Sequence, residues 1–410
     1  MSNVLPKRCV QCFLYNDSDE QISPREITVA ALFQIQNAVN NKCDGISPLS
    51  VKSLEAVKWT FRKLNENNYI PGVSIGLEAY PTCEMVEEAS DRAVDLIYKI
   101  RQDKQDSSFT EPPLVSLIGP GYSSEVQKTS NLLSSQRADD RLLQIGFSST
   151  AASLSNTNIY NNFFRVVASD AVQIEVMISL MTELKWNYIA IIYDDDIYGI
   201  EGKDALMTRV AKSSICVAAS FVLPIGAVSL IQVRDILQKI ITNGESPISG
   251  VVVLTSGAHA NAIVTAASAL KDTLSDPISF IFSEAIGLSD SYFTTNTGAV
   301  FKASKGAYVV SPPQIRVDEF EDYWLNTFRN VSRVVEETKT NIWLENVYKE
   351  YSSCSSSLSM CSELNSEQIE KASQMSSWTS YAIKAAYVTA KVLKTFTTTC
   401  VQDNKECAVT

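Results

Sequence analysis

Short apolar runs alternate with amphipathic segments over most of the chain, and this alternation restricts the fold more than any other feature. The runs are rich in β-branched and aliphatic residues and have the length of buried parallel strands. The segments between them repeat apolar residues at three- and four-residue spacing, which is typical of helices. A strand–helix alternation of this kind predicts parallel sheets with helices on both faces, and therefore an α/β fold.

The alternation predicts individual elements. The expected strands are 26–33, 71–79, 114–118, 142–147, 186–193, 215–223, 250–254 and 278–282. The expected helices are 49–65, 83–100, 125–133, 171–184, 202–212, 228–242, 258–270 and 376–394. A polar connection, 101–113, ends in Pro-Pro, and 311–313 reads Ser-Pro-Pro.

The pattern also predicts how the domains are divided. Two α/β units joined near 165–170 and 305–313 would form two lobes with a cleft between them. We expect the first lobe to comprise 1–167 and 309–410 and the second to comprise 168–308. A chain of 410 residues suits two domains of roughly 150–200 residues each.

Small hydroxyl residues follow two consecutive predicted strands. Strand 114–118 leads through Gly119-Pro120-Gly121 to Ser123 and Ser124, either of which could cap the next helix, and strand 142–147 ends on Ser148-Ser149-Thr150. Ligands of open α/β sheets lie outside the carboxyl ends of the strands, where helix N-termini offer N–H donors to anions. Ordinary caps and turns would explain either turn alone. The two together favour a binding site whose natural guest is a carboxylate.

Composition excludes several classes of protein. The chain is 45% hydrophobic and 20% charged, as folded globular proteins are, and its net charge of −11 comes without a basic stripe. We therefore expect no nucleic-acid partner. No apolar run approaches the roughly 20 residues needed to cross a bilayer, and the start of the chain has no hydrophobic signal core.

Nine cysteines, several of them in polar, loop-like surroundings, indicate an oxidising compartment, and a single histidine argues against a zinc site of mixed ligands. The cysteines are Cys9, Cys12, Cys43, Cys83, Cys216, Cys354, Cys361, Cys400 and Cys407. Only Cys9 and Cys12 have metal or redox spacing, and no strand–helix–strand pattern surrounds them, so disulfides are the favoured interpretation. Two N-x-S/T sequons, at Asn16 and Asn330, agree with a glycosylated extracellular protein.

Five stretches resemble the extracellular Venus flytrap ligand-binding domain of class C G-protein-coupled receptors, the metabotropic glutamate, calcium-sensing and type 1 taste receptors. They are IGPGYSSEVQ (118–127), QIGFSSTAASLSN (144–156), FFRVVASDAVQ (163–173), WNYIAIIYDDDIYGIEG (186–202) and FSEAIGLSD (282–290). The resemblance implies a bilobed, type-I periplasmic-binding-protein-like fold with two doubly wound parallel-sheet lobes around a ligand cleft. Closure on an L-α-amino acid would trigger signalling.

The resemblance also implies a cellular location and binding partners. The domain would lie at the extracellular face of the plasma membrane and dimerise through its first lobe. A G protein would be reached through a membrane module that we expect outside this chain, which resembles a fragment or a natural short form. The loop 102–113 has no cysteine of the kind that links subunits in some relatives, so we expect a dimer without that bridge.

Site residues follow from the resemblance position by position. Ser123, Ser148 and Thr150 would hold the α-carboxylate, and Ser149 lies in the same turn. Thr150 would also meet the α-ammonium group.

The other groups expected at the ammonium are Asp170, Tyr198 and Glu284, which supply negative charge and a ring face. The residues alone would favour a plain helix cap for Asp170 and a turn aromatic for Tyr198.

One departure from the family bears on specificity. In glutamate receptors basic side chains hold the ligand's distal carboxylate, whereas the matching positions here are Ser53 and Trp378, with Lys52 adjacent. Asp195, Glu284 and Trp378 near the distal end suit a neutral, aromatic or cationic amino acid better than glutamate.

No cofactor is expected, although Ca²⁺ or Cl⁻ stays open as a modulating ion. The turn 194–196 reads Asp-Asp-Asp and could bind Ca²⁺, but a solvated loop is the favoured interpretation.

The resemblance further implies the disulfides Cys43–Cys83, Cys354–Cys361 and Cys400–Cys407. Cys216 matches a residue that relatives pair with a further module, so we expect it to be free. Cys9 and Cys12 have no counterpart, and a local bridge or a dimer contact are both open.

Two other functions fit a chain of this kind less well. A receptor ectodomain with a degenerate cleft could bind a protein or peptide, as natriuretic-peptide receptors and glutamate-channel amino-terminal domains do, but the Ser-Ser-Thr turn argues against it. An enzyme is not expected, because the chain has no nucleophile elbow and no phosphate loop. His259, at the start of an Ala-rich helix, is predicted to be a surface residue rather than a base.

Overall fold

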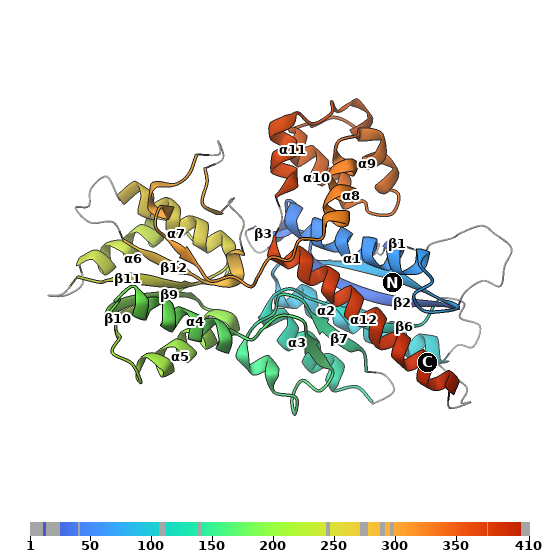
Figure 1. Cartoon of the computed structure of the whole chain (residues 1–410), viewed down its shortest axis with the longest axis horizontal. Coiled ribbons are helices and arrows are strands. Elements are labelled where there is room, and N and C mark those ends of the chain that lie inside the picture. The colour runs from blue at the N-terminus through green and yellow to red at the C-terminus, as the bar shows by residue number, and fades with distance from the viewer. Residues whose placement is uncertain are drawn as a thin grey trace, which may run out of the picture.

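The computed structural model describes residues 11–13, 25–39, 42–105, 112–137, 141–242, 247–270, 278–287, 292–295, 299–374 and 376–402. These residues form two α/β lobes that lie side by side (Figure 1). The lobe drawn in blue, cyan and red contains the first and the last of the described residues, and the green and yellow lobe contains the middle of the chain. The predicted bilobed α/β fold is confirmed.

The first lobe is built on a six-stranded sheet. In spatial order its strands are β1 (Gln11–Phe13), β5 (Val73–Thr82), β2 (Arg25–Gln34), β6 (Leu114–Ile118), β7 (Leu143–Gly146) and β8 (Phe163–Arg165). Strand β1 pairs antiparallel with β5, and the other pairs are parallel. The carboxyl ends of β6 and β7 therefore lie next to each other, which brings the two predicted hydroxyl turns together.

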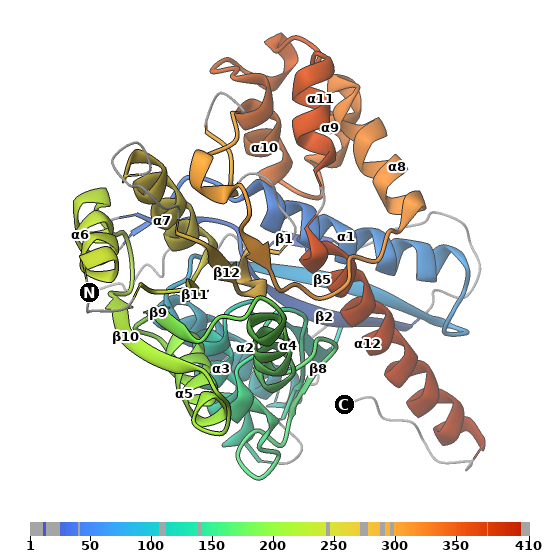
Figure 2. The ribbon, with the colours of Figure 1, turned by 60° about the vertical axis from the view of Figure 1, so that its left-hand side comes forward.

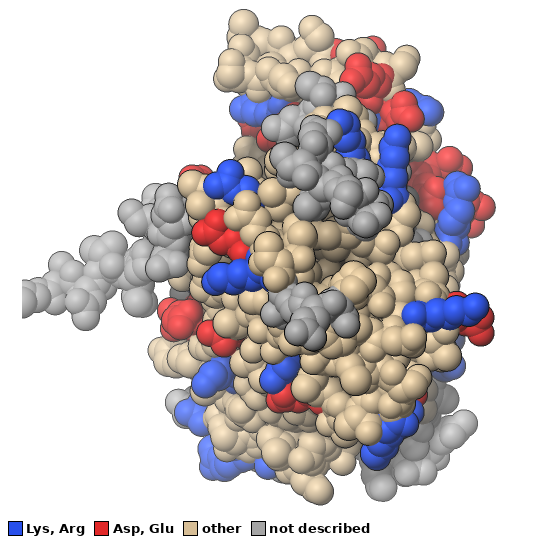
Figure 3. Space-filling view, turned by 90° about the vertical axis from the view of Figure 1, so that its left-hand side faces the viewer, with Lys and Arg blue, Asp and Glu red and all other residues tan. Residues whose placement is uncertain are grey.

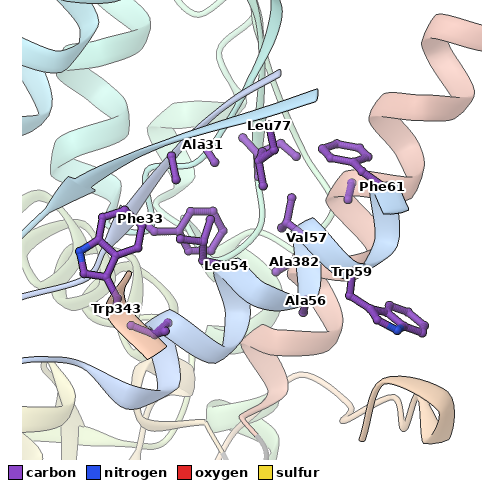
Figure 4. Packing of buried hydrophobic residues seen from close by; sticks show 14 of the residues in the cluster. Ala31, Phe33, Leu54, Ala56, Val57, Trp59, Phe61, Leu77, Trp343 and Ala382 are labelled. Atoms are coloured by element: carbon purple, nitrogen blue, oxygen red, sulfur yellow. The ribbon is translucent and has the colours of Figure 1, made fainter. Parts of the chain in front are cut away.

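Side chains of β2 alternate between two apolar layers, as a strand buried on both faces requires. Ala31 and Phe33 face helices α1 (Pro48–Glu66) and α12 (Ser377–Gln402), whereas Leu32 faces α2 (Val86–Gln105) and α3 (Ser123–Ser134). Figure 4 shows Phe33 packed beside Leu54 of α1. The Phe33 ring also stacks on Phe147, with ring centroids 4.7 Å apart.

The second lobe is built on a five-stranded parallel sheet. In spatial order its strands are β10 (Cys216–Leu223), β9 (Tyr188–Asp194), β11 (Gly250–Leu254), β12 (Phe280–Phe282) and β13 (Tyr308–Val309). Helices α4 (Asp170–Glu183) and α5 (Ile197–Val210) cover one face, and α6 (Leu230–Thr242) and α7 (Gly257–Leu270) cover the other (Figure 2). Val309, which the predicted division places in the first lobe, pairs with Phe282 of the second sheet.

A block of four helices, not predicted from the sequence, packs on α1 at the top of Figure 1. The helices are α8 (Asp318–Phe328), α9 (Val331–Glu337), α10 (Trp343–Ser352) and α11 (Ser366–Ser373). Trp324 of α8 is buried against the core of the first lobe. Lys52 of α1 is buried beneath this block, where Nζ donates to the carbonyl oxygens of Ala372 and Gln374 at 3.1 and 2.8 Å.

Short elements complete the chain. They are the antiparallel strands β3 (Asn37–Val39) and β4 (Lys42–Asp44) and the 3-10 helices η2 (Ala152–Ser155), η4 (Glu284–Ile286), η6 (Lys302–Ser304) and η7 (Leu358–Met360). Of the predicted polar connection 101–113, the first five residues continue α2, and 106–111 lie outside the described residues.

The cysteine predictions are confirmed where the structure describes them. Cys43 is bonded to Cys83 and Cys354 to Cys361, and Cys216 is free and exposed. The predicted Cys400–Cys407 bridge, Cys9, the side chain of Cys12 and the sequon at Asn16 lie outside the described residues. Asn330 is exposed at the start of α9, where its side-chain oxygen accepts from the N–H groups of Ser332 and Arg333.

The outward face of the molecule on the side of the second lobe is mixed in charge. On the face shown in Figure 3, Lys and Arg side chains lie among Asp and Glu side chains rather than in a continuous stripe. Among the described helices, none is both long and apolar enough to span a bilayer.

Candidate functional site

Ser123 joins the two hydroxyl turns of the first lobe. Its Oγ accepts hydrogen bonds from the backbone N–H groups of Thr150 at 3.2 Å and Ala151 at 3.1 Å. The prediction that Ser123 or Ser124 caps α3 was wrong, because the helix begins at Ser123 and Tyr122 occupies the cap position without a side-chain bond. A hydroxyl accepts two bonds and donates one, so the hydrogen of Ser123 is left for a further acceptor.

The other two serines of the turn differ in their partners. Ser148 Oγ donates to the carbonyl oxygen of Gly121 at 3.0 Å, which ties the second turn to the first. Ser149 is 1% exposed, and its Oγ has no hydrogen-bond partner among the described residues. Arg165, at the end of β8, donates to the carbonyl oxygens of Ser149 at 3.3 Å and Ala151 at 2.9 Å. Sequence reasoning missed Arg165, although it lies in one of the five family-like stretches.

Glu284 is the residue of the second lobe that contacts this turn. It follows β12 in η4, and Oε1 accepts a hydrogen bond from Thr150 Oγ1 at 2.9 Å. Its Oε2 accepts from the hydroxyl of Tyr198 at 3.0 Å. Tyr198 lies in the first turn of α5, whose start is capped by Asp196 accepting from the N–H of Gly199. Thr150, Tyr198 and Glu284 therefore converge between the lobes.

Asp170 joins the same cluster from the start of α4. The prediction that it caps this helix was wrong, because Ser169 holds the cap position and accepts from the N–H of Ala171. The N–H of Asp170 donates to the carbonyl oxygen of Thr150 at 2.9 Å.

Gln173, which sequence reasoning missed, links Asp170 to Glu284. Its Nε2 donates to Asp170 Oδ1 at 3.2 Å, and its Oε1 accepts from the N–H of Glu284 at 2.8 Å. A polar residue one turn after Asp170 shares its side of the helix, and this spacing could have identified it.

Burial dominates the electrostatics of the cluster. It raises the pKa of Asp170 to about 8, and the neighbouring charge of Glu284 acts in the same direction. Burial also raises the pKa of Glu284, against the hydrogen bonds from Thr150 and Tyr198. Within the described residues, no Lys or Arg side chain donates to either carboxyl group. A buried site rich in acceptors and lacking a direct cation favours a positively charged guest.

Trp378 and Asp195 occupy different surroundings. Trp378, at the start of α12, faces the segment that follows Glu284, since a methyl group on Gly287 would lie 3.8 Å from its Nε1. Asp195 is exposed, and the structure does not bring its side chain to the cluster. Ser53 is hydrogen-bonded to the hydroxyl of Thr379 at 3.1 Å.

His259 is buried, so the prediction of a surface residue was wrong. It is 5% exposed, with Nδ1 2.6 Å from Asp194 Oδ1 and Nε2 2.6 Å from the carbonyl oxygen of Gly226. The segment carrying Gly226 covers the ring, which the helical pattern around His259 does not reveal.

The three carboxyl groups of 194–196 therefore diverge, with Asp194 on His259, Asp196 capping α5 and Asp195 exposed. In the part of the chain that the structure describes, no three His, Cys, Asp or Glu side chains are grouped to hold a metal ion.

The comparisons with known proteins agree on one family. The family model described as receptor family ligand binding region matches residues 52–408. The chain is 28% identical over 230 residues to human G-protein coupled receptor family C group 6 member A, covering 52% of this chain and 24% of that protein. It is also 28% identical over 225 residues to taste receptor type 1 member 3 of Felis catus, covering 53% of this chain and 25% of that protein. The matched part thus spans about a quarter of the length of each relative.

Proposed function

The chain belongs to the family of receptor ligand-binding regions of class C G-protein-coupled receptors, and we propose that the polar cluster between its lobes senses an L-α-amino acid. The observation that carries the proposal is the convergence of Thr150, Tyr198 and Glu284 between the lobes. Groups from both lobes would contact one small ligand. A ligand that contacts both lobes binds the closed form better and shifts the population towards it.

The two ends of an amino acid find different partners in the cluster. The hydrogen of Ser123, the hydroxyl of Ser149 and the turn that contains them would hold the carboxylate. Asp170 and Glu284 would accept hydrogen bonds from the ammonium group, with Tyr198 beside them.

The surroundings favour a neutral, aromatic or cationic amino acid over glutamate. Neither Ser53 nor Trp378 supplies a positive charge, and the adjacent Lys52 is buried against the carbonyl oxygens of Ala372 and Gln374. A distal carboxylate would therefore lack a cation among these groups. Trp378 offers an apolar face instead.

We also propose where the domain lies and with what it assembles. The two disulfides among the described residues suit an oxidising, extracellular compartment. Exposed Val94 and Tyr98 on α2 supply an apolar surface for a dimer through the first lobe. The signal would pass to a G protein through a membrane module outside this chain.

A binding role is preferred over catalysis. Both ring nitrogens of His259 are already engaged, by Asp194 and by the carbonyl oxygen of Gly226, which leaves no nitrogen to act as a base.

The direct Thr150–Glu284 bond also fits a second candidate function. A cleft held shut by its own side chains would suit a receptor domain that binds a protein or peptide instead of a small ligand.

Calorimetry separates the two candidates. L-Alanine, L-phenylalanine, L-lysine and L-glutamate are titrated into the protein, with N-acetyl-L-phenylalanine as a control that lacks the ammonium group. We expect binding of at least one of the first three, weaker binding of glutamate and none of the acetylated control. If none of the α-amino acids binds and Thr150→Ala is indistinguishable from the parent, the amino-acid proposal is wrong and the second candidate stands.

A further inference from the structure

Asp170 and Glu284 form an unusual pair of buried carboxyl groups. They are 2% and 5% exposed, and Gln173 donates to the carboxyl group of Asp170 and accepts from the backbone N–H of Glu284. Oδ1 of Asp170 accepts from Gln173, but Oδ2 is buried without a hydrogen-bond partner among the described residues. An ionised carboxylate with a bare buried oxygen is costly, whereas a protonated carboxyl group is less so.

The charged and titratable groups around the pair do not neutralise it. From β8, Arg165 attracts Asp170, but its N–H groups donate to the carbonyl oxygens of Ser149 and Ala151. From α5, Glu201 adds negative charge beside Arg165.

The other titratable neighbour on α5, Tyr198, stays a neutral phenol because burial raises its pKa well above 10. Two ionised carboxylates at this place would therefore repel each other, and the nearby cation, Arg165, already donates to backbone carbonyl oxygens.

We propose that the Asp170–Glu284 pair holds one proton when no ammonium group is bound, and that binding of an ammonium group releases this proton to solvent. The inference extends the proposed function and rests on it for the identity of the bound ligand. The carboxyl O–H bond breaks, the proton passes to the buffer, and the carboxylate formed accepts an N–H bond from the ammonium group. One positive charge replaces another, so the charge of the buried cluster stays the same.

This exchange makes binding depend on pH. At pH values below the pKa of Asp170, about 8, the pair must lose a proton before it can hold the ammonium group. Affinity should then rise about tenfold for each pH unit and level off above pH 8. A site whose carboxylates are ionised throughout would show no such rise between pH 6 and 8.

Calorimetry in two buffers measures the released proton directly. L-Alanine, L-phenylalanine and L-lysine are titrated at pH 7 in phosphate and in Tris, whose ionisation enthalpies differ. We expect the parent to release close to one proton for each bound amino acid and Asp170→Asn to release none. The matched control is Asp235→Asn on α6, an exposed carboxyl group remote from the cluster, which should behave as the parent does. Binding without proton release would overturn the inference and leave the proposed function intact.

A second measurement needs no amino acid. The raised pKa of Asp170 stabilises the folded protein at pH values below about 4, and this contribution is lost as the pH rises to about 8. The midpoint of thermal unfolding should therefore fall more steeply between pH 5 and 8 in the parent than in Asp170→Asn. If none of the three amino acids binds, the proposed function fails, and this comparison still decides the inference. Equal slopes in the two proteins would refute it.

Discussion

The hydroxyl of Thr150 donates to Oε1 of Glu284 over 2.9 Å, and this bond joins the two lobes. Thr150 follows β7 in the first sheet, and Glu284 follows β12 in the second, 134 positions further along the chain. A further cross-lobe bond runs from the N–H of Ser153 in η2 to Oε2 of Glu201 on α5, at 3.0 Å. Substitution of Thr150 is therefore the most direct test of how the lobes and a ligand interact.

Thr150→Ala should weaken both stability and binding, whereas Thr150→Ser should largely preserve them. Loss of the hydroxyl leaves a buried carboxylate oxygen without its donor, at a cost of about 1–3 kcal/mol. We expect a loss of affinity of about tenfold for L-phenylalanine. Urea unfolding and calorimetry measure the two effects. If Thr150→Ser loses as much stability and affinity as Thr150→Ala, the hydroxyl is not the group that supports them.

Two glycines of α5 should respond in opposite ways to alanine. A Cβ on Gly199 would lie 2.3 Å from the backbone oxygen of Asp194, so Gly199→Ala must displace the first turn that carries Tyr198. We expect lower stability and weaker amino-acid binding.

Gly202→Ala is the matched control on the same helix. Its Cβ would meet only the Leu254 side chain at 3.4 Å, and alanine favours helices over glycine by about 1 kcal/mol. The control should be neutral or slightly stabilising in thermal unfolding. A Gly199→Ala protein with unchanged stability and binding would contradict the contact with Asp194.

His259 should contribute stability that declines as pH rises. Burial acts to lower its pKa, but the hydrogen bond and charge of Asp194 and the carbonyl oxygen of Gly226 prevail, so the pKa is raised above 6.5. The contribution is fully present below pH 6.5 and is lost as the pH rises through the raised pKa.

His259→Gln keeps a polar side chain but cannot titrate. The difference in unfolding midpoint between parent and variant should be largest at pH 5.5 and shrink towards pH 8.5. A difference that does not change with pH would mean that His259 is neutral in the folded protein.

The two described disulfides should differ in their contribution to stability. Cys43–Cys83 spans 40 positions and Cys354–Cys361 spans 7. Chain-entropy arguments predict contributions of about 4 and about 2.4 kcal/mol respectively. Replacing both cysteines of each pair by serine, followed by urea unfolding, tests this order. The reverse order would show that native packing around the bridges outweighs the entropy of the unfolded chain.

Regular elements were predicted well where the apolar pattern is local. Strands 114–118 and 250–254 have the predicted bounds, and helix 258–270 differs by one residue. Helices α8 to α11 were missed, because their apolar side chains such as Trp324 and Tyr348 become a core only against α1. The start of α5 was placed five residues late, since the Asp196 cap was not recognised.

The sequence by itself determined the strand–helix alternation over 26–282, the two hydroxyl turns and the family, because each of these depends on residues that lie close together along the chain. Only the tertiary structure decided which polar groups meet. Ser123 binds a turn 27 positions away, and Thr150 binds a carboxylate 134 positions away, with Gln173 between Asp170 and Glu284. Such contacts depend on which strands lie side by side within a sheet and on how the two sheets face each other, and burial then sets the charge of the groups that they enclose.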